Sequence, residues 1–315
     1  MKAGLIINKP PGITSHDVIY QLRKLPQLQN LKIGHSGTLD PFATGVLLVL
    51  LGNAVRLQDE LHVLPKTYRA EITLGKNTDT DDATGKRLTS PNPSFVRRGI
   101  REVLLSFRRR GLGEVRSEKI PSKTQILSAL DTIKDQTTQI PPNYSAIKIN
   151  GKKMYDLARK GEIVEQKPRN ITIHDIALET YSYPKLTISV TCSTGTYIRA
   201  IARDIGSILG TGGYCSRLER TAIGNFTIQR AVQLQSIPEN INSVLISLEQ
   251  LTEHLESISF NDLNVAKLKN GREVEAGENT PINIRLVLKN SDNKVFGIGI
   301  RESEALFIKP KKIFL

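Results

Sequence analysis

The sequence is poor in the residues that build disulfide frameworks and metal sites. It contains two cysteines, Cys192 and Cys215, and neither belongs to a C-x-x-C pair. Two isolated thiols predict no disulfide scaffold and no zinc ribbon, and they favour a reducing compartment such as the cytoplasm. The five histidines do not occur in H-x-H or H-E-x-x-H spacing. No metal site is therefore expected.

Long apolar segments are also missing. The first residues, MKAGLIINKPPG, hold an apolar stretch of five residues before Asn8, which is too short for the core of a signal peptide. No apolar run approaches the roughly 20 residues that a transmembrane helix requires. The sequence thus predicts neither export nor a membrane anchor.

Basic residues are abundant. The chain has 44 lysines and arginines against 31 aspartates and glutamates, a formal net charge of +13 and a pI near 9.7. A positive field of this size favours binding to polyanions at moderate salt. RNA, DNA and an anionic membrane surface are the candidate partners on charge alone.

Hydrophobic periodicity predicts an α+β fold. In KTYRAEITLG every second residue is apolar, which predicts a half-buried strand with Tyr68 near its start. Between residues 185 and 210 the pattern changes from alternation to helical spacing, which predicts a strand, a glycine turn and a helix capped near Thr196. Asn150-Gly151 predicts a tight hairpin. The acidic segment NTDTDDATGK predicts a solvated turn.

The length of 315 residues predicts one large domain and a smaller one. Short alternating strands after Leu248 predict a small C-terminal β-barrel. Residues 94–119 carry eight basic and three acidic side chains and fit neither neighbouring segment. We interpret them as an insertion, which is either a solvated loop or a nucleic-acid contact.

The first candidate reacting group lies in the segment GHSGTLDPFATG. This segment places Asp40 in a glycine-rich turn, and the following Pro41 biases Asp40 away from helical geometry. An Asp-Pro pair also initiates ordinary turns, so the segment alone leaves open whether Asp40 is a turn residue or a reacting group. His35 either contacts RNA or closes the loop. Tyr68 is either a core residue or a stacking platform.

A second polar group occurs in STGTYIRAIARDIG. Tyr197 and Arg199 are expected in the first turn of a helix, where the helix dipole and a guanidinium favour an anion. If Arg199 reaches Asp40, it holds that carboxylate ionised and oriented. The alternative is that Arg199 and Arg203, four residues apart, form the solvated face of the helix.

Several segments together resemble the bacterial TruB family of tRNA pseudouridine-55 synthases. They cover most of residues 1–235 in the family's order, and they are GHSGTLDPFATGVLLVLLGNA, KTYRAEITLGKNTDTDDATG, IPPNYSAIKINGKKMYDLARKG, CSTGTYIRAIARDIG and SRLERTAIGNF. The resemblance implies a mixed, mainly antiparallel sheet with the pseudouridine synthase fold over residues 1–247. It also implies a PUA-like RNA-binding domain over residues 248–315.

The resemblance further implies the site. The implied roles are the catalytic carboxylate for Asp40, its partner for Arg199, a contact to the target nucleotide for His35, base stacking for Tyr68, and pocket walls for Tyr197 and Leu218. Tyr197 is also a candidate for removing the C5 proton. Two features depart from the family: segment 94–119 looks inserted, and Glu219 stands where arginine is usual.

The implied reaction isomerises uridine 55 of the tRNA T-loop. The bond from N1 to C1′ breaks, the uracil turns and rejoins through C5, and no cofactor is needed. A carboxylate suits an electron-poor sugar carbon, but the sequence leaves open whether Asp40 attacks C1′, attacks C6 or removes the 2′ proton. The uridine has to be flipped out of the tRNA elbow, and the T stem-loop is expected to be recognised by shape. A cytoplasmic monomer is expected.

Two other classes are open at this point. An RNA-binding tRNA-folding chaperone without catalysis accounts for the net charge and the C-terminal barrel, but it gives Asp40, Tyr197 and Arg199 no purpose. A hydrolytic nucleosidase requires a second carboxyl group and an activated water. No such carboxyl pair occurs near the Asp40 segment.

Overall fold

The computed structural model describes residues 1–88, 120–142, 144–145, 148–149, 152–153, 167–277, 279–302 and 306–314. The Arg-rich segment 94–119 lies outside these residues, so its interpretation as an insertion stays a prediction. The chain divides into two compact units. The first comprises residues 1–40, 47–63 and 229–315, and the second comprises residues 41–46 and 64–228.

The second unit is built on a mainly antiparallel sheet. Its strands lie in the order β11 (Ile173–Ser182), β12 (Lys185–Cys192), β4 (Lys66–Leu74) and β13 (Gly213–Ile223). The first residues of β3 (Thr44–Gly52) pair in parallel with β13, and β14 (Phe226–Thr227) pairs antiparallel with it. The predicted alternation in β4 is confirmed, because Ala70, Ile72 and Leu74 are buried and Arg69 is exposed.

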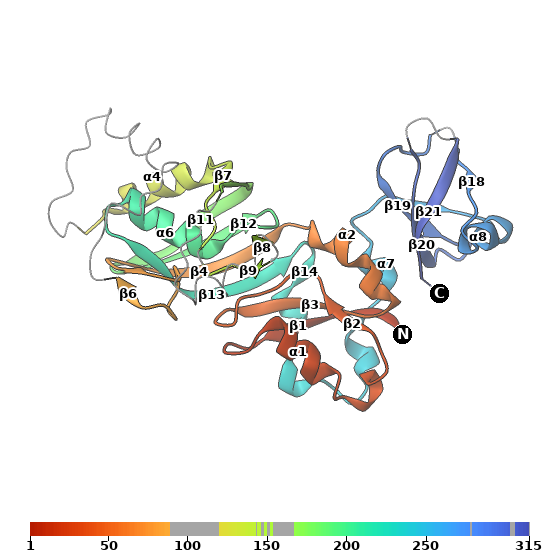
Figure 1. Cartoon of the computed structure of the whole chain (residues 1–315), viewed down its shortest axis with the longest axis horizontal. Coiled ribbons are helices and arrows are strands. Elements are labelled where there is room, and N and C mark those ends of the chain that lie inside the picture. Colours follow the sequence, from red (N-terminus) through yellow and green to blue (C-terminus); the bar gives the residue numbers. More distant parts are fainter. Residues whose placement is uncertain are drawn as a thin grey trace. The chain divides into compact units, whose positions relative to one another are not determined.

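Two helices cover this sheet. Helix α6 (Ile198–Ile208) packs on β13 and β4, while α4 (Lys123–Lys134) packs on β11 and on α6 (Figure 1). Both helices bury an apolar stripe, which in α6 includes Ile198, Ile201 and Ile205. Helix α6 starts one residue later than expected, because its N-cap is Tyr197. The second unit thereby presents the start of α6 beside β4 and β13.

Short strand pairs complete the second unit. β5 (Asn77–Thr78) pairs with β6 (Arg87–Leu88), and β7 (Thr138–Gln139) pairs with β10 (Arg169–Asn170). β8 (Lys148–Ile149) pairs antiparallel with β9 (Lys152–Lys153), as the Asn150-Gly151 turn predicts.

The first unit contains the N-terminal strand and a helix that packs beneath it. β1 (Lys2–Lys9) lies beside β3, and it also pairs in parallel with β15 (Val232–Gln233) and antiparallel with β16 (Leu245–Ile246). β2 (Ile33–His35) is antiparallel to β3. Helix α1 (Ser15–Leu22) begins with a capping box between Thr14 and Asp17 and buries its apolar face in the core of this unit.

The C-terminal part of the first unit is a five-stranded sheet with its own core. Its order is β17 (Ser257–Ser259), β19 (Arg285–Lys289), β20 (Val295–Ile300), β21 (Phe307–Ile313) and β18 (Val274–Glu275). Helix α8 (Asp262–Lys269) contributes Val265 and Leu268 to that core. Two short helices precede these strands, α2 (Gln58–His62) and α7 (Leu248–Leu251). The α+β class is confirmed, whereas a domain boundary at residue 248 stays a prediction.

Candidate active site

Asp40 lies in the loop between β2 and β3, and the peptide beside it is held firmly. The hydroxyl of Ser15, the first residue of α1, accepts a hydrogen bond from the backbone N–H of Leu39 at 2.9 Å and donates to the Leu39 carbonyl at 3.3 Å. The backbone N–H of Ser36 donates to the carbonyl of Leu48 at 3.0 Å. Asp40 is half-buried. The loop is thus anchored on both α1 and β3.

His35 helps to close this loop. Its Nδ1 accepts a hydrogen bond from the backbone N–H of Gly37 at 3.3 Å. Gly37 has φ = 134°, a conformation that favours glycine. Of the two interpretations of His35, loop closure is confirmed, and a contact to the target nucleotide stays a prediction.

Tyr68 and Leu218 lie on neighbouring strands of the second unit. In the antiparallel register of β4 and β13, Tyr68 is opposite Arg220 and Ala70 is opposite Leu218. Residues opposite each other, and residues two apart, share one face of a sheet, so Tyr68 and Leu218 project from the same face. Tyr68 is half-buried and Leu218 is buried. The roles of Tyr68 in base stacking and of Leu218 as a pocket wall stay predictions.

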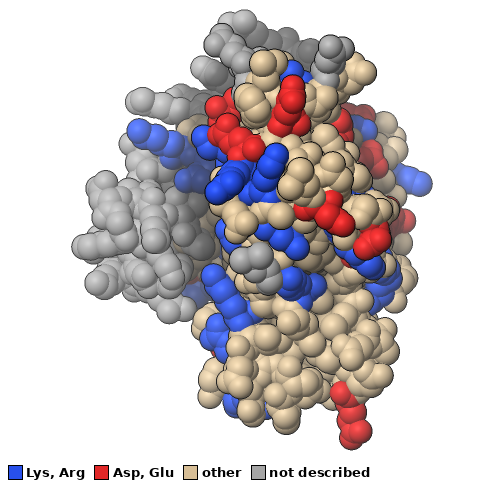
Figure 2. All heavy atoms as spheres, turned by 90° about the vertical axis from the view of Figure 1, so that its right-hand side faces the viewer, with Lys and Arg blue, Asp and Glu red and all other residues tan. Residues whose placement is uncertain are grey.

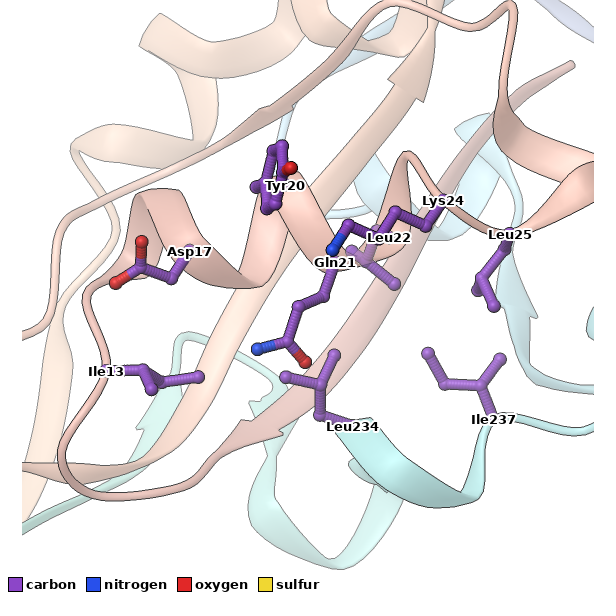
Figure 3. A pocket seen from close by; sticks show the side chains of 9 residues that line it. All are labelled: Ile13, Asp17, Tyr20, Gln21, Leu22, Lys24, Leu25, Leu234 and Ile237. Atoms are coloured by element: carbon purple, nitrogen blue, oxygen red, sulfur yellow. The ribbon is translucent and has the colours of Figure 1, made fainter.

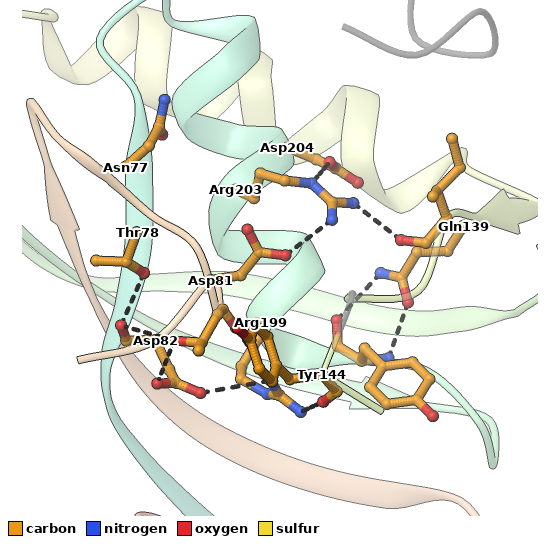
Figure 4. A network of polar contacts seen from close by, with 12 residues as sticks. Asn77, Thr78, Asp81, Asp82, Gln139, Tyr144, Arg199, Arg203 and Asp204 are labelled. Atoms are coloured by element: carbon orange, nitrogen blue, oxygen red, sulfur yellow. Dashed lines mark hydrogen bonds and ion pairs between the residues drawn. The ribbon is translucent and has the colours of Figure 1, made fainter. Parts of the chain in front are cut away.

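Arg199 is buried and held at fixed points. Its guanidinium donates to the carbonyls of Thr80 and Tyr144 at 3.0 Å each and lies 3.4 Å from Oδ2 of Asp82 (Figure 4). The alternative that Arg199 belongs to a solvated helix face is wrong, because it is 4% exposed. Its predicted pairing with Asp40 stays a prediction.

Arg203, one turn further along α6, forms a second set of contacts. Its guanidinium contacts Oδ2 of Asp81 and Oδ1 of Asp204 at 2.9 Å each, and it donates to the carbonyl of Ile140 at 2.9 Å. Burial alone would lower the pKa of Arg203, but the two carboxylates outweigh burial and raise it. Burial raises the pKa of Asp81 to about 6 and also raises that of Asp204. Two mostly buried carboxylates therefore share one guanidinium.

The acidic segment NTDTDDATGK is not the solvated turn that its composition predicts. Asp82 is 4% exposed, and its Oδ1 accepts hydrogen bonds from the backbone N–H of Thr84 at 2.9 Å and from the hydroxyl of Thr80 at 2.8 Å. Asp81 takes the left-handed conformation with φ = 61°. A sequence signal did exist: two arginines four residues apart on a mostly apolar helix, with Asp204 as its one acidic residue, need a further buried counter-charge.

A lysine joins the start of β4 to the turn before α6. The Lys66 ammonium donates to the carbonyl of Leu64 at 2.7 Å and to the hydroxyl of Thr194. Burial lowers the pKa of Lys66 to about 8, and the positive charge of Arg220 acts in the same direction. Lys66 was not singled out by the sequence, because one lysine at a strand start gives no distinctive pattern.

Neither the hollow in the first unit nor a metal site supports a catalytic role elsewhere in the described residues. A hollow of about 580 Å³ in the first unit contains none of the predicted site residues; it is lined by Ile13, Asp17, Tyr20, Gln21, Leu22, Lys24, Leu25, Leu234 and Ile237 (Figure 3). Within the described ranges, no three His, Cys, Asp or Glu side chains are grouped as a metal site requires. In the same ranges, no helix has both the length and the apolar character to cross a membrane.

Two models of known protein families match this chain. The model described as "TruB family pseudouridylate synthase (N terminal domain)" matches residues 23–112 and 111–198. The model described as "tRNA pseudouridylate synthase B C-terminal domain" matches residues 199–258. The fold and the matches define a pseudouridylate synthase, an isomerase. More particularly, the chain belongs to the TruB family.

Individual relatives are similar over most of the chain. The protein named tRNA pseudouridine synthase B from Caldanaerobacter subterraneus subsp. tengcongensis is 37% identical over 98% of both chains. Its namesake from Alkaliphilus oremlandii is 37% identical over 87% of this chain and 83% of that protein. Among solved structures, a chain of a Cbf5-Nop10-Gar1 complex has a TM-score of 0.71 and 22% identity over 99% of this chain and 85% of that one, a likeness of fold.

Proposed function

We propose that this chain is a tRNA pseudouridine synthase that isomerises uridine 55 in the T-loop. The observation that carries the proposal is its similarity, over 98% of both chains, to a protein named tRNA pseudouridine synthase B. The GHSGTLDPFATG segment that motivates the assignment folds as a loop fixed to α1 and β3. A chaperone without catalysis gives that loop no chemical purpose.

Asp40 is the reacting group in this proposal, and Arg199 orients it. The carbonyls of Thr80 and Tyr144 and the Asp82 carboxylate hold the Arg199 guanidinium in place, so orienting a second carboxylate would cost Arg199 little side-chain entropy. Asp40 attacks C1′, attacks C6 or removes the 2′ proton as the N1–C1′ bond breaks. The uracil then turns, C5 bonds to C1′, and the C5 proton is lost to a base while N1 gains one. Atoms balance without a cofactor.

The freed uracil has to stay in the pocket until it rejoins the sugar. Tyr68 stacks on the base in this proposal, and Leu218 and Tyr197 form further walls. His35 contacts the target nucleotide, and the Tyr197 phenol serves as the base for the C5 proton. Tyr68 and Leu218 suit these roles because they project from one face of the sheet.

The partner in this proposal is tRNA. Figure 2 shows exposed lysine and arginine side chains in groups on one face, with acidic side chains among them. The net charge of +13 offsets part of the cost of extruding a uridine, which is a few kcal/mol. We further propose a cytoplasmic monomer with a catalytic domain over residues 1–247 and a PUA-like RNA-binding domain over residues 248–315. Sedimentation analysis of the pure protein checks the monomer.

The test is to incubate the protein with an unmodified tRNA transcript and to map pseudouridine by chemical sequencing. A single pseudouridine at position 55 is expected. Asp40→Asn should abolish turnover and keep tRNA binding, because it keeps the shape and removes the nucleophilic charge. Asp292→Asn, at an exposed turn, is the matched control.

Three results would contradict the proposal. Turnover by Asp40→Asn excludes Asp40 as the reacting group. Release of free uracil instead of pseudouridine identifies a hydrolytic nucleosidase. Faster tRNA folding without any pseudouridine identifies a chaperone.

A further inference from the structure

We propose that Gln139 is a positioning residue for Tyr197 and thereby for the uridine pocket. The inference rests on the proposed function, because it concerns a residue of the proposed site. Gln139 ends β7 and is 3% exposed. Nothing in the sequence around Gln139 marks it as a site residue.

Both polar atoms of the Gln139 side chain bind the backbone of a single residue. Its Oε1 accepts a hydrogen bond from the backbone N–H of Tyr197 at 2.8 Å, and its Nε2 donates to the Tyr197 carbonyl at 3.1 Å. The side-chain amide thus acts on Tyr197 as a neighbouring strand would, through a donor and an acceptor together. Such a paired contact restrains the two peptide groups that flank the Tyr197 Cα.

Tyr197 is a point where that restraint matters. It is the N-cap of α6, with φ = −97° and ψ = 111°, and its own side chain makes no capping hydrogen bond. The Tyr197 carbonyl is already held by the backbone N–H groups of Ala200 and Ile201, at 3.1 and 3.2 Å, whereas the Tyr197 N–H precedes the helical ladder and donates to Gln139 instead. Gln139 therefore restrains the Tyr197 backbone on the side that the helix does not hold.

The chain that follows Gln139 holds the same helix. The carbonyl of Ile140 accepts from Arg203, and that of Tyr144 accepts from Arg199. Gln139 contacts Tyr197 itself, at the N-cap of the same helix. The expected consequence of losing Gln139 is therefore a displaced phenol with the two arginines still held.

A first test does not depend on catalysis. Hydrogen exchange at the Tyr197 amide, followed by NMR of the whole chain, should become about two- to tenfold faster in Gln139→Ala, because one hydrogen bond is lost. The matched control is Gln136→Ala, since the side-chain oxygen of Gln136 is buried without a hydrogen-bond partner among the described residues. Unchanged exchange at Tyr197 in Gln139→Ala would overturn the proposal.

A second test separates positioning from general stability. At saturating tRNA, kcat of Gln139→Ala should fall about 10- to 100-fold, because a reacting group is displaced, and KM should change less than about twofold. In a Tyr197→Ala background the same substitution should have little effect under single-turnover conditions. Equal losses in both backgrounds would overturn the proposal, as would a kcat no lower than that of Gln136→Ala.

The conservative variant provides a pH signature. The Gln139→Glu side chain, when ionised, accepts from the Tyr197 N–H but repels its carbonyl; when protonated it donates as the amide does. Burial raises the pKa of such a carboxyl group, so the group becomes protonated as pH falls from about 8 to about 6. Over that range the kcat of Gln139→Glu should rise relative to that of the unaltered enzyme. A ratio independent of pH would contradict positioning by Gln139. Loss of pseudouridine formation by the unaltered chain would contradict only the proposed function.

Discussion

At the scale of single residues, the pair of carboxylates around Arg203 determines a pH response. Asp81 has a folded pKa of about 6 against an ordinary value of 3.8, and its side chain is 13% exposed. The folded state therefore holds this proton more tightly than the unfolded state does. Between the two pKa values the folded state binds more protons, so a rise in pH lowers the free energy of unfolding.

We predict that Asp81→Asn removes this response. From about pH 4 to about pH 6, the unfolding free energy of the unaltered chain should fall relative to that of Asp81→Asn by about 1 to 3 kcal/mol, and the difference should be flat above pH 7. Urea unfolding at a series of pH values measures it. A difference that grows with pH would show that ionised Asp81 stabilises the fold.

Whether a prediction was confirmed depends on how far apart in the sequence the interacting residues lie. The alternation around Tyr68 is local, and the structure confirms it. The burial of Asp82 depends on Arg199, which is more than a hundred residues away in the chain. Turn composition alone could not reveal it, since free Asp and Thr residues form solvated turns. The contact between Gln139 and Tyr197 could not be predicted for the same reason, since the two residues are distant in the sequence.

At the scale of secondary-structure elements, a buried acid joins α2 to the C-terminal sheet within the first unit. The side chain of Glu60 is 1% exposed and contacts Lys312 of β21 at 2.9 Å and Arg285 of β19. The carbonyl of Glu60 also lies 3.2 Å from Nε2 of His254. A charge this deeply buried needs both partners to offset its lost hydration.

We predict that Glu60→Gln lowers the free energy of unfolding by about 2 to 4 kcal/mol, because two cations lose their buried counter-charge. Asp59→Asn is the matched control: Asp59 lies 3.0 Å from the same lysine but is 73% exposed, so its loss should cost less than about 1 kcal/mol. Thermal melts of the three proteins measure both effects. Equal losses of unfolding free energy in Glu60→Gln and Asp59→Asn would mean that the burial of Glu60 contributes nothing to stability.

Long elements were predictable, as was the hairpin at Asn150-Gly151, whereas short strands without a turn signal were not. The strand of residues 66–74 and the helix of residues 198–208 each carry a full period of apolar residues. The two-residue strands β7 and β10 have no period at all, and only pairing with a distant segment defines them. The register that brings Tyr68 and Leu218 to one face also arises from pairing, which a single sequence does not contain.

At the scale of the whole molecule, charge governs the expected affinity for RNA. The family model matches in two stretches that meet within the Arg-rich segment, at residues 111–112. That segment contains Arg97, Arg98, Arg101, Arg108, Arg109, Arg110 and Arg116. If some of these bind phosphate, each contact releases counterions from the tRNA.

We predict that deleting residues 95–118 flattens the slope of log affinity against log salt by about one to two contacts and leaves turnover at saturating tRNA unchanged. Filter binding at several salt concentrations measures the slope. A variant that keeps the length but replaces the seven arginines with glutamine is the control for loop length. An unchanged slope would identify a solvated loop, and an inactive deletion would show that the segment belongs to the core.

The first unit is assembled from both ends of the chain, and this sets an order for its folding during protein synthesis. β1 pairs with residues 232–233 and 245–246, and the side chain of Lys2 binds the carbonyl of Phe314. Residues 64–228 are contiguous and can fold as they leave the ribosome, because domains generally fold as units. One edge of β1 therefore waits for residues 232–233 and 245–246, and until these are made it presents unpaired backbone N–H and C=O groups to other chains.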